Sequence, residues 1–216
     1  MVKNQNKQDG FSVYSAIVWL AGVLAVMLFS FMLLSIISDK KVNYKYDTDN
    51  IGHHVTLIGD SISFRSKDEI LEELPGVDFE AVKGIKFSEY REGFGEGGLT
   101  RLKRHAMRDV IVFLLGTNGG VNSSEINDLI DYVGPKRKII LMTAYRETAD
   151  IQKWNQRVYK YSNSEDNVYL IDWYIINLGN ADRYLLSDRV HPNKEGRAYF
   201  AKMIKQTVLE ALELSE

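Results

Sequence analysis

The sequence predicts an α/β domain with a mostly parallel sheet, preceded by one long apolar helix. After about residue 50, short apolar runs alternate with stretches of helical periodicity. Continuous apolar runs of this kind are typical of strands that are buried on both faces. Strands that alternate with helices indicate a parallel sheet with right-handed crossovers. Before this region, residues 11–37 form a run of 27 residues without one charge.

The composition excludes several classes of protein. The chain has 216 residues, no cysteine and a formal net charge of -2. The lack of cysteine rules out a disulfide scaffold, cysteine-ligated metal and a cysteine nucleophile. Because Lys+Arg at 27 nearly balances Asp+Glu at 29, no global basic field exists to hold nucleic acid.

Residues 11–37 are expected to form a retained transmembrane anchor behind a short tail, residues 1–10. About 20 apolar residues suffice to span a bilayer as a helix. A cleaved signal peptide is the main alternative, but its apolar region would be shorter, and the sequence at 33–38 is a poor cleavage site. Lysines lie on both sides of the run, so charge does not decide its orientation. Residues 38–50 are interpreted as a juxtamembrane linker and residues 51–216 as the folded domain.

Five strands and five helices are expected in this domain. The strands are predicted at residues 54–58, 77–82, 109–115, 138–142 and 168–171. The helices are predicted at residues 67–74, 89–107, 124–133, 151–161 and 193–212. Ligands of such sheets bind beyond the carboxyl ends of the strands. The polar, glycine-rich strand ends should therefore share one edge.

Ser61 follows the first strand and is a candidate nucleophile. A serine needs a base to take its proton, and the chain has four histidines. Among them, His191 stands three residues after Asp188, a spacing that lets a carboxylate in a turn accept the other ring N–H. Pro192 is then expected to begin the last helix.

The other histidines are poorer candidates for the base. His105 lies in a basic helical segment and is interpreted as a surface residue. His53 and His54 precede the first strand, at the end of the sheet opposite Ser61.

Acyl transfer also needs donors for a developing oxyanion. The candidates are the backbone N–H of Ser61, the N–H of Gly84 after the second strand, and the side-chain amide of Asn118 after the third. A turn glycine or a loop asparagine is by itself common. The joint order is more specific, because these residues and His191 converge on one edge of the sheet.

These residues resemble the four sequence blocks of the SGNH, or GDSL-type, hydrolase superfamily. The resemblance covers about residues 52–212 and rests on Gly59-Asp60-Ser61-Ile62, Gly84, Gly116-Thr117-Asn118 and Asp188-Arg189-Val190-His191. It implies a flavodoxin-like three-layer α/β/α sandwich with a five-stranded parallel sheet. It also implies Ser61 as nucleophile, His191 as base, Asp188 as its orienting carboxylate, and Ser61, Gly84 and Asn118 as the oxyanion hole. No metal or organic cofactor is implied.

Gly119 departs from the aspartate that many esterases of the superfamily carry after the asparagine. Gly-Thr-Asn-Gly is similar to the extracytoplasmic SGNH domains of bacterial cell-wall O-acetyltransferases. Trp154, Trp173 and Tyr174 also resemble that branch, in which aromatic residues line the approach to the site. Core packing is the alternative for these three residues.

Three functions follow as hypotheses. The first is an enzyme, held at the cell membrane by residues 11–37 with its domain outside the cytoplasm, that adds or removes O-acetyl groups on a cell-wall or surface glycan. That branch usually fuses the SGNH domain to a multi-helix membrane acyltransferase, so a transferase with one span would need a separate acyl-delivery protein. The second is a general esterase or lipase for small or lipidic esters. The third is a non-catalytic domain that binds glycan or a partner.

Overall fold

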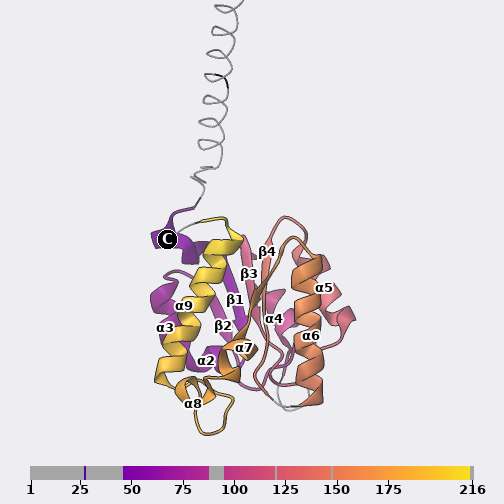
Figure 1. Ribbon diagram of the computed structural model, residues 1–216. Coiled ribbons are helices and arrows are strands. Elements are labelled where there is room, and N and C mark those ends of the chain that lie inside the picture. Colours follow the sequence, from indigo (N-terminus) through magenta and orange to yellow (C-terminus); the bar gives the residue numbers. More distant parts are fainter. Residues whose placement is uncertain (1–26, 28–45, 88–94, 120, 147, 215–216) are drawn as a thin grey trace, which may run out of the picture. The chain divides into compact units, whose positions relative to one another are not determined.

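The computed structural model describes residues 27, 46–87, 95–119, 121–146 and 148–214. Five strands form one sheet in the order β2-β1-β3-β4-β5, and every neighbouring pair is parallel (Figure 1). The strands are β1 Val55–Gly59, β2 Asp78–Ala81, β3 Val110–Leu114, β4 Lys138–Met142 and β5 Val168–Ile171. The predicted five-stranded parallel sheet is confirmed, and each strand lies within about two residues of its expected range.

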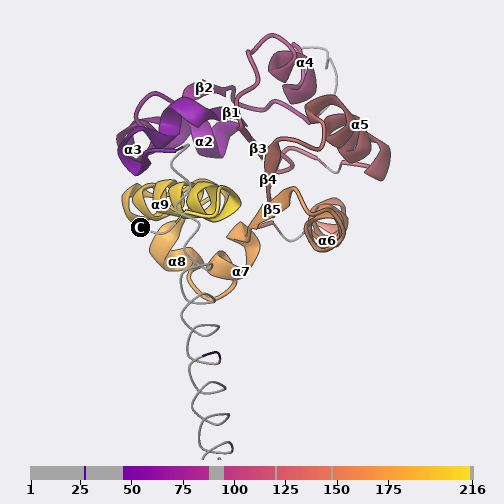
Figure 2. The same ribbon diagram turned by 90° about the horizontal axis from the view of Figure 1, so that it is seen from above.

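Helices cover both faces of the sheet, which gives three layers (Figure 2). One face carries α2 Ser61–Arg65, α3 Lys67–Glu73, α7 Trp173–Leu178, α8 Ala181–Tyr184 and α9 Lys194–Ala211. The other face carries α4 Gly98–Leu102, α5 Ser123–Val133 and α6 Ala149–Ser164. The short helices α2, α7 and α8 lack enough turns to show a clear helical period in the sequence.

The sheet separates two apolar cores, and β3 contributes to both. Val110, Val112 and Leu114 pack into the core beneath α3 and α9. Ile111 and Phe113 pack into the core beneath α4, α5 and α6. This division follows from the strand itself, since successive side chains point to opposite faces. It explains why the run is apolar at every position.

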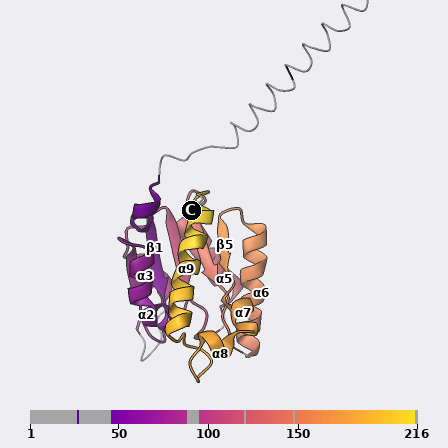
Figure 3. The ribbon, with the colours of Figure 1, turned by 60° about the vertical axis from the view of Figure 1, so that its left-hand side comes forward.

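α3 and α9 lie side by side on one face of the sheet (Figure 3). Arg197 Nε lies 2.7 Å from Glu69 Oε1, and Lys205 Nζ lies 3.4 Å from Glu73 Oε2. These ion pairs join the edges of two helices whose apolar faces already share one core. The last helix of the chain is thereby fixed against the helix that follows the Ser61 segment.

The helix predicted at 89–107 is wrong over most of its described length. α4 covers only Gly98–Leu102, and residues 88–94 lie outside the described residues. Gly95 has a φ of 75°, a left-handed conformation that a helix cannot contain. Beyond Lys103 the chain turns, and the His105 ring reaches carboxylates on β2.

The folded unit includes residues that the sequence assigned to the linker. The 3-10 helix η1, Thr48–His54, crosses the predicted boundary at residues 50 and 51. The Tyr46 ring meets the His54 ring edge-on, with centroids 4.7 Å apart.

Apart from Met27, the predicted anchor at 11–37 lies outside the described residues. No helix among the residues that the structure describes is long and apolar enough to cross a bilayer.

Candidate active site

Ser61 lies at the carboxyl end of β1, in the first turn of α2. Asp60 caps this helix, because its Oδ1 accepts a hydrogen bond from the backbone N–H of Ile62 at 2.9 Å. A Cβ on Gly59 would lie 2.3 Å from the Ser63 side chain, so only glycine permits this tight entry from strand to helix. The end of β1, the close turn at Gly59 and the Asp60 cap together fix the position of the Ser61 side chain.

A continuous set of hydrogen bonds links Ser61, His191 and Asp188. The Oγ of Ser61 lies 2.9 Å from Nε2 of His191. The Nδ1 of the same ring lies 2.7 Å from Oδ2 of Asp188. The serine and the histidine are 130 residues apart in the sequence, so the fold brings them together. With Nδ1 protonated toward the carboxylate, Nε2 is free to accept the serine proton.

The loop that carries His191 is closed at its base. Leu185 and Pro192 form an antiparallel bridge, and the backbone N–H of Leu186 donates to the carbonyl of His191 at 2.8 Å. The prediction that Pro192 begins the last helix is wrong. Asn193 is the N-cap of α9 and accepts a hydrogen bond from the backbone N–H of Gly196 at 3.0 Å.

Asp188 also holds the loop from within. Its Oδ1 accepts hydrogen bonds from the backbone N–H groups of Val190 and His191, each at 3.0 Å. Burial by itself would raise the pKa of Asp188, but the hydrogen bonds from the backbone and ring of His191 and from Val190 outweigh it and lower the pKa to about 2. The carboxylate is therefore ionised at neutral pH and can stabilise an imidazolium on His191.

Gly84 and Asn118 lie beside Ser61, as their positions after β2 and β3 predict. Gly84 has a φ of 75°, which favours glycine. The Nδ2 of Asn118 donates to the carbonyl of Ile85 at 3.1 Å and to Oδ2 of Asp60 at 3.4 Å. Burial raises the pKa of Asp60 to about 6. The hydrogen bond to Asp60, the residue that precedes Ser61, orients the amide of Asn118.

A cavity of about 520 Å³ opens at this edge of the sheet. Its lining consists of Ser61, Arg65, Lys83, Gly84, Asn118, Arg146, Asp188, Val190 and His191. All five residues expected to carry the chemistry are in this set. The three cations were not expected. The helix α2 was not predicted from the sequence. With that helix predicted, Arg65 would have been expected beside Ser61, since residues four apart share a helix face.

Two tryptophans expected near the site lie in the core instead. Trp154 and Trp173 have no exposed surface. The indole N–H of Trp154 donates to the carbonyl of Met142 at 3.1 Å, and the Trp173 ring meets Phe200 edge-on with centroids 5.0 Å apart. Tyr174 is half-buried against the same core as Trp173. None of the three lines the cavity, so core packing describes their positions.

Comparisons with known proteins agree with this fold. No family model matches the chain. The O-acetyltransferase OatA of Staphylococcus aureus is 24% identical over 161 residues, which cover 70% of this chain. The match spans only 24% of that curated relative's length.

Solved structures resemble the chain over most of their length. The C-terminal catalytic domain of Streptococcus pneumoniae peptidoglycan O-acetyltransferase A, solved with a methylsulfonyl adduct, has a TM-score of 0.62 at 18% identity, over 75% of this chain and 97% of that domain. The Clostridium thermocellum family 3 carbohydrate esterase has a TM-score of 0.51 at 18% identity, over 74% of this chain and 96% of the esterase.

A G-D-S-L lipolytic protein of Veillonella parvula has a TM-score of 0.52 at 18% identity, over 72% of this chain and 96% of that protein. The structural neighbours thus include a GDSL-family protein and a protein described as an SGNH hydrolase, and the resemblance expected from the sequence is confirmed.

Proposed function

We propose that this chain is a membrane-anchored serine enzyme that adds or removes O-acetyl groups on a cell-wall or surface glycan. One observation carries the proposal: the hydrogen-bonded series of Ser61, His191 and Asp188, open to a cavity at the edge of the sheet. The likeness to OatA and to a carbohydrate esterase supports both directions of the chemistry.

In the first half-reaction His191 accepts the Ser61 hydroxyl proton on Nε2, while Oγ bonds to the acyl carbonyl carbon. The carbonyl oxygen becomes an oxyanion that the N–H groups of Ser61 and Gly84 and the amide of Asn118 stabilise. When this intermediate collapses, the bond to the leaving oxygen breaks and that oxygen takes the proton from Nε2. Asp188 holds the imidazolium throughout.

In the second half-reaction a hydroxyl of the acceptor gives its proton to Nε2 and its oxygen bonds to the acyl carbon. The bond to Ser61 Oγ then breaks and Oγ regains the proton. A glycan hydroxyl as acceptor makes the enzyme an O-acetyltransferase. Water as acceptor makes it an esterase, since the acyl-enzyme is the same.

The lining of the cavity favours a short acyl group. Among the described residues that line it, Val190 is the one with an aliphatic side chain, and most of the others are polar or charged. Pockets for long acyl chains are mostly apolar, so this cavity supports acetyl esters over lipidic ones. A domain that only binds would not need Ser61, His191 and Asp188 in this order.

The membrane part of the proposal rests on residues 11–37, a run without charge that exceeds the length needed for one span. The curated relative is about four times longer than the segment that matches this chain. For a transferase, we propose that a multi-helix membrane acyltransferase delivers the acetyl group to Ser61.

The test compares the full-length chain with Ser61→Ala. Acetate release from an activated acetyl ester is followed, and mass spectrometry then looks for an acetyl group on the Ser61 peptide and on added glycan oligomers. Ser164→Ala, an exposed serine on α6, is the matched control and should behave as the parent.

Serine-dependent acetylated glycan supports the transferase, and serine-dependent acetate alone supports the esterase. Acetylation or turnover that persists in Ser61→Ala would contradict the proposal. Loss in Ser164→Ala as well would point to a folding defect in both variants.

A further inference from the structure

Cationic side chains surround the candidate site on three elements. Arg65 comes from α2, one helical turn after Ser61. Lys83 precedes Gly84 in the loop after β2, and Arg146 follows β4. All three line the cavity and are exposed at its mouth.

Among the described residues that line the cavity, Asp188 is the one acid, and it forms no ion pair with any of the three cations. Both oxygens of Asp188 are occupied, one by the His191 ring and the other by two backbone N–H groups. Within the described part of the chain, Arg65 forms no ion pair. The ammonium of Lys83 lies over the Phe64 ring, 4.6 Å from its centroid, and Arg146 donates to the carbonyl of Thr117 at 3.2 Å. These contacts orient the two cations, and neither cation is paired with a carboxylate among the described residues.

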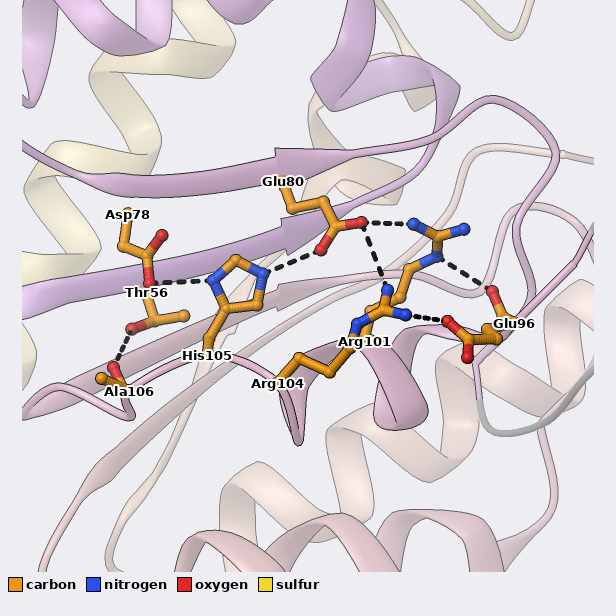
Figure 4. A network of polar contacts seen from close by, with 8 residues as sticks. All are labelled: Thr56, Asp78, Glu80, Glu96, Arg101, Arg104, His105 and Ala106. Carbon is orange, nitrogen blue, oxygen red and sulfur yellow. Dashed lines mark hydrogen bonds and ion pairs between the residues drawn. The ribbon is translucent and has the colours of Figure 1, made fainter.

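The basic segment before β3 gives the opposite picture. Arg101 and Arg104 bind Glu80 and Glu96, and both ring nitrogens of His105 bind carboxylates on β2 (Figure 4). Arg108 donates to three backbone carbonyls. The cations named in this segment are thus paired with carboxylates or carbonyls of the fold, whereas the cations of the cavity face solvent.

We infer that the cavity beside Ser61 binds an anionic group, a phosphate or a carboxylate, carried by the acyl acceptor. This inference rests on the proposed function and adds the chemical class of the acceptor to it. Arg65 and Ser61 share one face of α2, where side chains four residues apart start roughly 5–6 Å from one another. The anionic group would therefore lie within a few bonds of the hydroxyl that receives the acyl group.

The experiment compares three acceptors on the full-length chain in a neutral detergent. They are an N-acetylglucosamine tetramer, the same tetramer with carboxylate-bearing lactyl ethers, and a glycerol phosphate oligomer. The first is uncharged, and the other two separate a carboxylate source from a phosphate source. Acylation of Ser61 by a neutral activated ester is measured first, because it does not depend on the acceptor.

The variants are Arg65→Gln and Lys83→Gln, singly and together. Arg146 is left in place because it also holds the Thr117 carbonyl. Lys202→Gln, an exposed lysine on α9, is the matched control. We expect each cavity variant to raise KM for the anionic acceptor about two- to fivefold, the range of one exposed charge pair. Added salt should shrink the effect, and acylation by the neutral ester should not change.

The outcomes separate the two proposals. If Ser61 is acylated but the enzyme shows no preference for an anionic acceptor, the inference is overturned and the proposed function stands. The same holds if Lys202→Gln raises KM for the anionic acceptor as much as the cavity variants do. If Ser61 is never acylated, calorimetric titration of the glycerol phosphate oligomer and the carboxylated tetramer decides. Binding that falls in the double variant supports the anion site while the proposed function fails, and absence of binding overturns both.

Discussion

The side-chain amide of Asn118 donates to the carboxylate of Asp60 across 3.4 Å. This contact joins the loop after β3 to the residue that caps α2 and precedes Ser61. Asp60 is fully buried, so its protonation state affects both the cap and the orientation of the amide. Two of the sequence blocks that define the candidate site are thus coupled by one buried carboxyl group.

Asp60→Asn should change how stability depends on pH. Burial raises the pKa of Asp60 from 3.8 to about 6. An acid whose pKa is higher in the folded state than in the unfolded state contributes stability below its unfolded-state pKa. That contribution is lost as the pH rises through its folded-state pKa. The rise corresponds to about 3 kcal/mol. Relative to the parent, Asp60→Asn should therefore gain stability between pH 4 and pH 7, as measured by urea denaturation.

Asp128→Asn is the control for this measurement, because Asp128 is exposed on α5. Its free energy of unfolding should follow that of the parent at every pH. A constant difference between Asp60→Asn and the parent across this range would contradict a raised pKa for Asp60.

Asn118→Ala should slow acylation with little effect on substrate binding. Loss of one oxyanion donor typically lowers kcat by about 100- to 1000-fold. Rapid-quench measurement of the acyl-enzyme isolates this step, and Asn163→Ala on α6 serves as an exposed control. Since Asn118 donates to Asp60 and Ile85 in this structure, unchanged acylation would mean that its amide serves only to hold the loop.

Trp154→Phe should lower stability and leave KM unchanged, because Trp154 lies in the core. The change removes the donor for the Met142 carbonyl, and a buried polar group left unsatisfied costs about 1–3 kcal/mol. Trp173 is equally buried, but its indole N–H has no acceptor among the described residues. Trp173→Phe should therefore cost less. Circular dichroism during urea denaturation measures both, and a raised KM in either variant would place that ring at the site.

The sequence predicted the strands and the site edge for a physical reason. Strands buried on both faces leave continuous apolar runs, and parallel strands bring the polar segments that follow them to one edge. Ser61, Gly84, Asn118 and His191 therefore gather as expected.

The features that the sequence did not predict depend on packing between distant segments. Of the long helix expected at 89–107, the described residues form only α4, because Gly95 is left-handed and His105 binds β2. Trp154 is buried because it fills the space beside Gly116, where a Cβ would lie 2.2 Å from the indole nitrogen. The cations of the cavity come from three elements, so no single segment of sequence reveals them.

His105 shows this dependence on distant segments most clearly. The sequence placed it on the surface, but Nδ1 lies 2.9 Å from Asp78 and Nε2 lies 2.8 Å from Glu80 (Figure 4). β2 is an edge strand, and this pairing covers it with charge, which discourages further strand pairing. Burial by itself would lower the pKa of His105, but its hydrogen bonds to Glu80 and Asp78 raise it.

His105→Gln should therefore destabilise the fold most at acidic pH. A histidine whose pKa is raised in the folded state contributes stability below its ordinary pKa of 6.5. That contribution is lost as the pH rises through its folded-state pKa. We expect a deficit on the order of 2 kcal/mol near pH 6, shrinking near pH 9, in urea denaturation followed by tryptophan fluorescence. His53→Gln, at an exposed position, should show no such deficit. A deficit that stays equal at both pH values would mean that His105 contributes by packing and not by its charge.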